Sequence, residues 1–107
     1  MERTILVVED EAITRNHLRL ILQEAGYGVR VAPTAEEAIR CMAEEDFSCV
    51  LCDWKLPGMD GLGLLQWVRQ YHLETPVVIM TAFATIEHAV AAMGQGAADY
   101  LTKPFGI

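Results

Sequence analysis

Five polar residues of this chain follow or close short apolar runs, and together they have the chemistry of a metal-assisted group-transfer site. They are Glu9, Asp10, Asp53, Thr81 and Lys103. Neighbouring carboxylates repel one another, and a folded protein tolerates them mainly when a cation neutralises them. Oxygen ligands without a converging His or Cys favour a hard ion, above all Mg²⁺. A hydroxyl, an ammonium and a divalent ion around one carboxylate are what a phosphoryl group arriving on that carboxylate needs.

Asp53 is the residue on which such chemistry would centre. The apolar run 49–52 leads directly into it, and turn residues follow as far as Gly61. In an open α/β sheet, ligands bind outside the carboxyl ends of the strands, so an acid at this point faces the binding crevice. An aspartate here also serves simply to cap the next turn, and on this stretch alone both interpretations stand.

The elements that must position these residues alternate between strand and helix patterns. Apolar and β-branched runs predict strands at 4–8, 28–32, 48–53, 76–81 and 97–102. Amphipathic spacing and capping residues predict helices at 11–25, 34–45, 61–71 and 85–94. For the first helix, the predicted apolar stripe consists of Ile13, His17, Leu20 and Ile21, with Leu18 beside it.

This strand and helix alternation predicts an α/β fold, a three-layer sandwich with a parallel sheet. Right-handed crossovers place helices on both faces, and the simplest strand order is 2-1-3-4-5. The crevice then lies between strands one and three, where the lateral direction of the chain reverses. We therefore expect Glu9 and Asp10 to lie beside Asp53.

Composition and charge restrict the class of protein. The 107 residues are 52% hydrophobic and 21% charged, which predicts one folded domain over 1–107. Eight basic and 15 acidic residues give a net charge of −7, so we expect contact with DNA only through a separate domain. No apolar run has the length of a membrane span and no signal-peptide core is visible, which predicts a cytoplasmic protein without membrane contact.

Two of the three cysteines, Cys49 and Cys52, have the C-x-x-C spacing of a redox pair. Residues three apart in a strand point to opposite faces of the sheet. We therefore expect buried structural thiols at these positions and at Cys41.

The ordered acids, hydroxyl and lysine, together with the loop 53–61, resemble the receiver domain of two-component response regulators, which has the CheY-like, flavodoxin-like fold. The resemblance covers essentially the whole chain. It implies that Asp53 accepts a phosphoryl group from the phosphohistidine of a sensor histidine kinase. Such a domain is a regulatory phosphoacceptor and not an ordinary enzyme, although it assists its own phosphorylation and dephosphorylation.

The same resemblance assigns roles around Asp53. Asp10 would ligate Mg²⁺ directly and Glu9 mostly through water, with Asp53 and the backbone carbonyl of Lys55 completing the protein ligands. Lys103 would contact the phosphoryl oxygens.

Thr81 and Tyr100 resemble the switch pair of this family. The Thr81 hydroxyl would move toward the phosphoryl group, and Tyr100 would turn inward from an exposed position. Lys55 and Phe83 stand where the family tunes water access, and their bulk predicts a phosphorylated state that lasts minutes. The family often has a cis peptide at the position of Lys103-Pro104.

The end of the chain departs from the family pattern. Receivers continue with a fifth helix after the Lys-Pro turn, and residues 105–107 do not supply it. We expect a truncated chain, with apolar surface bare beside the first helix and a tendency to self-associate. The expected native contacts are a homodimer through the fourth helix and fifth strand, and a kinase on the first helix. The residues expected to contact the kinase are Thr14, Asn16, His17, Leu18 and Ile21.

The output of the switch is less closely defined than the switch itself. Segments 81–85 and 97–105 resemble receivers joined to AAA+ activators of the NtrC and DctD groups, which favours transcription regulation. The alternatives are the receiver part of a hybrid histidine kinase and a receiver-like interaction module without phosphotransfer. A flavin or nucleotide binder would need a phosphate-binding loop after the first strand, where two acids stand. An aspartate-dependent phosphohydrolase would need a second acid in place of Lys55.

Overall fold

The computed structural model describes residues 3–82 and 85–103. Strands and helices alternate over these residues, and their bounds differ from the predicted ones by at most two residues. The strands are β1 Thr4–Val8, β2 Gly28–Ala32, β3 Cys49–Asp53, β4 Val77–Thr81 and β5 Asp99–Thr102, and the helices are α1 Ala12–Glu24, α2 Ala35–Glu44, α3 Gly61–Tyr71 and α4 Ile86–Gly94.

The five strands form one parallel sheet in the order β2-β1-β3-β4-β5, which confirms the predicted topology. Val8 near the end of β1 is paired with Cys52 of β3, so the residues that follow these strands leave the sheet side by side. On the other side of β3, Asp53 is paired with Met80. The register therefore brings the ends of β1, β3 and β4 to one edge of the sheet.

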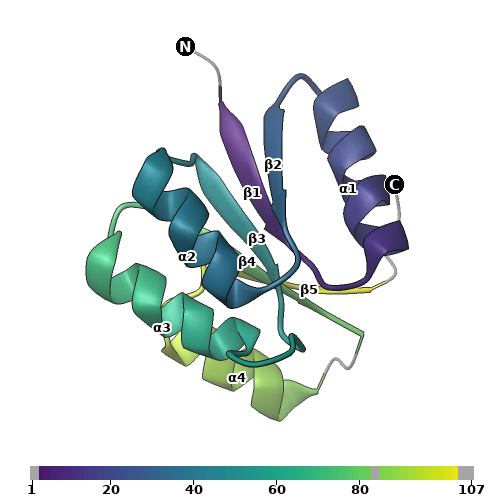
Figure 1. The fold of residues 1–107 in the computed structure, drawn as a ribbon. Coiled ribbons are helices and arrows are strands. Elements are labelled where there is room, and N and C mark those ends of the chain that lie inside the picture. Colours follow the sequence, from purple (N-terminus) through teal and green to yellow (C-terminus); the bar gives the residue numbers. More distant parts are fainter. Residues whose placement is uncertain (1–2, 83–84, 104–107) are drawn as a thin grey trace.

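Helices cover both faces of the sheet. Helices α2, α3 and α4 lie on one face, and among the described helices α1 alone lies on the other (Figure 1). Successive strand residues alternate between these faces. Leu6 and Val8 enter the larger core with α2, α3 and α4, whereas Val7 packs with Leu18 of α1 and Met80 of β4.

The orientation of α1 differs from the predicted stripe. Leu18 is buried and Leu22 packs beside it, whereas Ile13 is 82% exposed and Leu20 is 49% exposed. Apolar residues occur on several sides of this helix, so sequence spacing did not define one face. The face that packs on the sheet contains Leu18, and the predicted role of Ile13 and Leu20 as core residues is wrong.

The free cysteines agree with the predicted structural thiols, although Cys49 is only partly buried.

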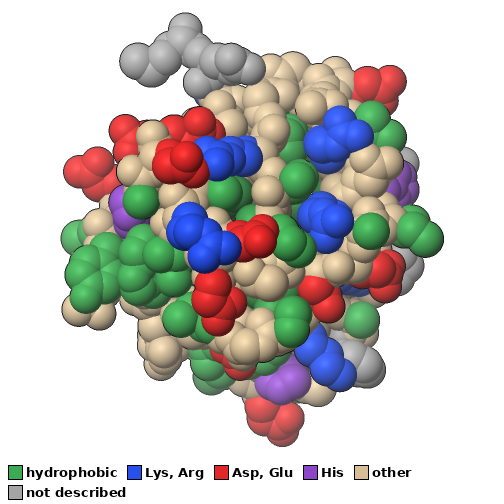
Figure 2. Space-filling model, viewed as in Figure 1, with side chains coloured by type: hydrophobic (Ala, Val, Ile, Leu, Met, Phe, Trp, Pro, Cys, Tyr) green, Lys and Arg blue, Asp and Glu red, His purple; other side chains and the backbone are tan. Residues whose placement is uncertain are grey.

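On the face seen in Figure 2, acidic and basic side chains are interspersed, and an apolar area lies at its left edge. Over the described residues, no helix has the length and apolar character needed to cross a membrane.

Candidate functional site

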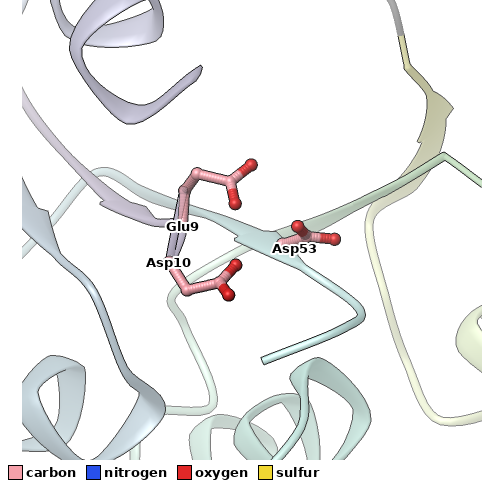
Figure 3. Close-up of side chains that lie close together, drawn as sticks. All are labelled: Glu9, Asp10 and Asp53. Carbon is pink, nitrogen blue, oxygen red and sulfur yellow. The ribbon is translucent and has the colours of Figure 1, made fainter. Parts of the chain in front are cut away.

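Three carboxylates converge where β1 and β3 end. Glu9 and Asp10 follow β1, Asp53 is the last residue of β3, and one oxygen from each lies within 4.8 Å of the others. Figure 3 shows the Glu9 and Asp10 side chains extending from the end of β1 toward the side on which Asp53 lies. Glu9 and Asp53 are buried, while Asp10 is exposed. Carboxylate oxygens from three side chains, one of them open to solvent, fit a hard divalent ion such as Mg²⁺.

Lys103 forms ion pairs with the two buried members of this cluster. Its Nζ donates to Oδ2 of Asp53 at 2.8 Å and also donates to Oε1 of Glu9. Burial opposes the charged form of the lysine, but these two hydrogen bonds together with the negative charges of Asp53 and Glu9 outweigh burial, and the pKa of Lys103 is raised. The ammonium therefore remains charged near neutral pH beside Asp53.

Glu9 has the perturbed titration expected of a carboxyl group inside a protein. Glu9 is only 1% exposed. Burial raises the pKa of Glu9 to about 6, although the hydrogen bonds from Lys103 and from the Glu11 amide oppose the rise. Protons therefore compete for this carboxylate at mildly acidic pH.

The loop that follows Asp53 is held tightly against the end of β3. The Lys55 amide donates to Oδ1 of Asp53 at 3.3 Å, and the Gly61 amide donates to the Trp54 carbonyl at 2.8 Å. A Cβ atom at Gly61 would lie 2.3 Å from the Asp53 carbonyl oxygen, so a side chain there would displace the strand end. The Asp60 side chain then caps α3 by accepting from the Gly63 amide at 2.8 Å.

These residues surround a hollow of about 460 Å³ at the sheet edge. Its lining consists of Glu9, Asp10, Glu11, Asp53, Lys55, Leu56, Pro57, Thr81, Ala82 and Lys103. All five polar residues singled out from the sequence thus face one space. Thr81 is buried at the end of β4, and its carbonyl accepts from the Lys103 amide at 2.7 Å. This volume accommodates a hydrated ion and a phosphoryl group together.

Tyr100 lies on β5, beside β4. It is paired in register with Ile79, so its side chain is on the same sheet face as Ile79 and Thr81. Tyr100 is half-buried and packs against the larger core, whereas the expected starting position was an exposed one. Phe83 and Pro104, to which we assigned slow hydrolysis and a cis peptide, lie outside the described residues.

Two contacts of this region were not predicted. Arg15 of α1 donates through Nη1 to the carbonyl oxygens of Glu9 and Asp10, at 3.0 and 3.3 Å. The indole of Trp54 stacks on His88 of α4, with ring centroids 4.7 Å apart. The acceptors of Arg15 are backbone atoms, which leave no signal in a sequence. Trp54 and His88 are far apart in the chain, and no sequence motif relates their positions.

Comparison with known proteins agrees with this geometry. The family model of the response regulator receiver domain matches residues 5–107. The chain therefore belongs to the response regulator receiver domain family.

Individual relatives support this assignment. The response regulator protein FleR of Pseudomonas aeruginosa is 43% identical over 105 residues, which cover 98% of this chain and 22% of FleR. The DNA-binding transcriptional regulator NtrC of Escherichia coli K12 is 41% identical over 108 residues, covering 100% of this chain and 23% of NtrC. The chain thus spans less than a quarter of the length of these two relatives.

A solved structure extends the comparison to three dimensions. A Burkholderia pseudomallei response regulator, crystallised with a phosphorylated aspartic acid, calcium ion and citrate, superposes with a TM-score of 0.91. It is 30% identical, and the match covers 98% of this chain and 62% of that one. The predicted receiver fold is confirmed.

Proposed function

We propose that this domain is a signalling switch in which Asp53 accepts a phosphoryl group from the phosphohistidine of a sensor histidine kinase. The observation that carries the proposal is the environment of one carboxylate. Asp53 lies 2.8 Å from the Lys103 ammonium and has oxygens of Glu9 and Asp10 within 4.8 Å. Family membership and the phosphorylated aspartic acid of the Burkholderia response regulator support it.

The proposed step is an in-line transfer between two nucleophiles. A carboxylate oxygen of Asp53 attacks phosphorus as the bond from phosphorus to the histidine nitrogen breaks. The electron pair of the broken bond stays on the imidazole, and Asp53 becomes an acyl phosphate. Lys103 already contacts Asp53 and would follow the negative charge onto the phosphoryl oxygens. Hydrolysis of the acyl phosphate by water would release inorganic phosphate and return the free Asp53 carboxylate.

We infer that Mg²⁺ is held by Asp10 and Asp53, with Glu9 acting mostly through water and the Lys55 carbonyl as a further ligand. The acidic cluster has the donor type and spacing that such an ion requires. When bound, the ion supplies charge neutralisation between the carboxylates and the incoming phosphoryl oxygens.

The direct test is the intact mass of the protein after incubation with acetyl phosphate and Mg²⁺. We expect the mass of one added phosphoryl group, and no addition in EDTA. An unchanged mass with both reagents, and also with a phosphorylated histidine kinase as donor, would instead favour the interaction module without phosphotransfer.

The titration of Glu9 predicts how Mg²⁺ binding varies with pH. Because the pKa of Glu9 is raised to about 6, its carboxyl group is mostly protonated below about pH 6 in the metal-free fold and mostly ionised above it. Mg²⁺ affinity should therefore rise about tenfold between pH 5 and pH 7, because binding needs the ionised form. Isothermal titration calorimetry measures this directly. Glu9→Gln should bind more weakly and lose most of the dependence, and equal wild-type affinity at both pH values would contradict the prediction.

We propose Thr81 and Tyr100 as the elements that transmit phosphorylation. Thr81 lines the hollow that would receive the phosphoryl group. Tyr100 shares its sheet face and is only half-buried, which leaves room for a change of rotamer. Movement of the hydroxyl toward the phosphoryl oxygens would open space beside Tyr100.

We propose that the switch regulates transcription through a separate output domain. The relative NtrC is described as a DNA-binding transcriptional regulator, and this chain corresponds to only 23% of its length. The alternative to a transcriptional output is that this domain is the receiver part of a hybrid histidine kinase. We also infer a cytoplasmic location, consistent with the cytoplasmic site of transcription.

The exposed face of α4 and β5 is the proposed site of homodimer contact. Ile86, Val90 and Met93 are 83%, 65% and 49% exposed, and they recur at helical spacing on α4. The three α4 residues form an apolar stripe, which is the type of surface that a partner covers. Leu101 of β5 is 37% exposed, but it is paired with Met80 and so lies on the sheet face opposite α4.

A charge within this stripe should prevent the contact. Val90→Asp should remain monomeric under phosphorylating conditions in which the wild type forms dimers, as measured by sedimentation. The matched control, Leu73→Asp, changes another exposed apolar residue, 66% exposed, away from α4. Equal dimerisation of the wild type and the Val90 variant would rule out this surface.

For the kinase we propose the exposed side of α1. Asn16 and His17 are exposed and remain candidates, with Thr14 and Ile21 half-buried beside them. Leu18 is only 6% exposed and packs in the core, so its predicted place in this contact is wrong.

A further inference from the structure

The turn between β1 and α1 carries two of the three carboxylates of the site. Glu9 and Asp10 have little regular structure to hold them, because β1 ends at Val8 and α1 begins at Ala12. The Glu9 amide still bonds to the Ala32 carbonyl of β2 at 3.0 Å. After the Glu9 amide the chain leaves the sheet, and the position of the Asp10 carboxylate depends on contacts made with the turn.

Arg15 closes this turn from the first part of α1. One guanidinium nitrogen, Nη1, donates to the carbonyl oxygens of both Glu9 and Asp10, at 3.0 and 3.3 Å. On the other side of the same turn, the Glu11 amide donates to Oε2 of Glu9 at 3.2 Å. The two acidic residues are therefore held through their backbone by Arg15, and the carboxylate of Glu9 is held by the turn itself.

We propose that Arg15 is a positioning residue for the metal site, an inference that rests on the proposed function. By fixing the carbonyls of Glu9 and Asp10, it sets where their carboxylates stand relative to Asp53. Arg15 does not line the hollow and contributes no ligand atom. Residues that orient metal ligands without touching the ion typically change metal affinity by about 10-fold to 100-fold.

A positioning role of Arg15 and simple electrostatics predict changes of opposite sign in Mg²⁺ affinity. A cation beside an acidic site repels Mg²⁺, so removing the charge alone should strengthen Mg²⁺ binding slightly. Removing a positioning residue should weaken it. The two roles of Arg15 are thus separated by the direction of the change.

Arg19 provides a matched control one turn further along α1. Like Arg15, it is half-buried. Its guanidinium donates to the Gln23 and Asn16 side chains of the same helix and not to the turn that carries the acids. Arg15→Gln and Arg19→Gln therefore make the same change of charge on the same helix, but only the first releases the carbonyls.

The experiment compares Mg²⁺ dissociation constants of the wild type, Arg15→Gln, Arg19→Gln and Arg15→Lys by calorimetry near neutral pH. We expect binding about tenfold weaker for Arg15→Gln, unchanged or slightly tighter for Arg19→Gln, and intermediate for Arg15→Lys. In phosphorylation by acetyl phosphate, Arg15→Gln should need more Mg²⁺ but reach nearly the wild-type rate at saturation. Equal constants for the two Gln variants would overturn the proposal.

A metal-free measurement keeps the inference separate from the proposed function. Arg15→Gln should speed hydrogen exchange at the Glu11 amide, which bonds to Glu9, while Arg19→Gln should leave it unchanged. A wild type that binds no Mg²⁺ would contradict the proposed function, and unchanged Glu11 exchange would contradict the role of Arg15. If Arg15→Gln does not fold, Arg15→Lys serves: weaker Mg²⁺ binding with the charge intact supports positioning, and wild-type binding overturns it.

Discussion

Asp53→Asn should abolish the metal-dependent gain of a phosphoryl group from acetyl phosphate. The substitution keeps the size of the side chain and most of its hydrogen bonding, but it removes the nucleophilic carboxylate. No other carboxylate of the cluster has the same surroundings, because among the described residues the Lys103 ammonium donates to Glu9 and Asp53 and not to Asp10, and burial raises the pKa of Glu9 to about 6. Intact mass spectrometry after a fixed incubation measures the loss.

The control for this variant is Asp46→Asn. Asp46 lies in the loop between α2 and β3 and lines a separate hollow, so its substitution should leave phosphorylation at the wild-type level. Full phosphorylation of Asp53→Asn would mean that another residue is the acceptor.

Lys103→Met should give a large loss of stability in the absence of metal. Glu9 and Asp53 are 1% and 7% exposed, and Lys103 donates to both. Leaving buried carboxylates without their cation typically costs about 3–5 kcal/mol. Because the Lys103 side chain is itself 18% exposed, we expect about 2 kcal/mol at neutral pH in EDTA. Urea denaturation measures the difference.

Two further measurements identify the cause of that loss. Millimolar Mg²⁺ should restore part of the stability of Lys103→Met, because the ion replaces the missing positive charge. Arg30→Met removes the same charge from an exposed pair, with Arg30 and Glu44 2.7 Å apart, and should cost less than about 1 kcal/mol. Equal losses for the two variants in EDTA would show that Lys103 does not stabilise the buried carboxylates.

The site was largely predictable from the sequence because its residues follow from the topology. In a parallel sheet the carboxyl ends of neighbouring strands meet, so the strand order places Glu9 and Asp10 beside Asp53 without knowledge of side-chain packing. Lys103 follows β5 and has a long side chain, which reaches across the end of β4 to Asp53. Its hydrogen bond to Glu9 was not predicted, since the expected partner was the phosphoryl group.

The contacts made by helices were harder to predict. Helix α1 carries apolar residues on several sides, and only packing against Val7 and Met80 shows that Leu18 faces inward while Ile13 is exposed. Arg15 looked like an ordinary helical cation, because its acceptors are carbonyl oxygens of the preceding turn. The sequence thus predicted which side chains share the site but not the backbone contacts that hold them.

The chemical location of the phosphoryl group tests the central claim most directly. Borohydride reduces an acyl phosphate of aspartate to homoserine, and peptide mass spectrometry then identifies the residue. After incubation of the wild type with Mg²⁺ and a phosphorylated histidine kinase, we predict homoserine at position 53 and an unmodified residue 53 when EDTA is present. Homoserine at another aspartate, or a phosphoryl group stable to borohydride on a different residue type, would contradict the assignment of Asp53 as the phosphoacceptor.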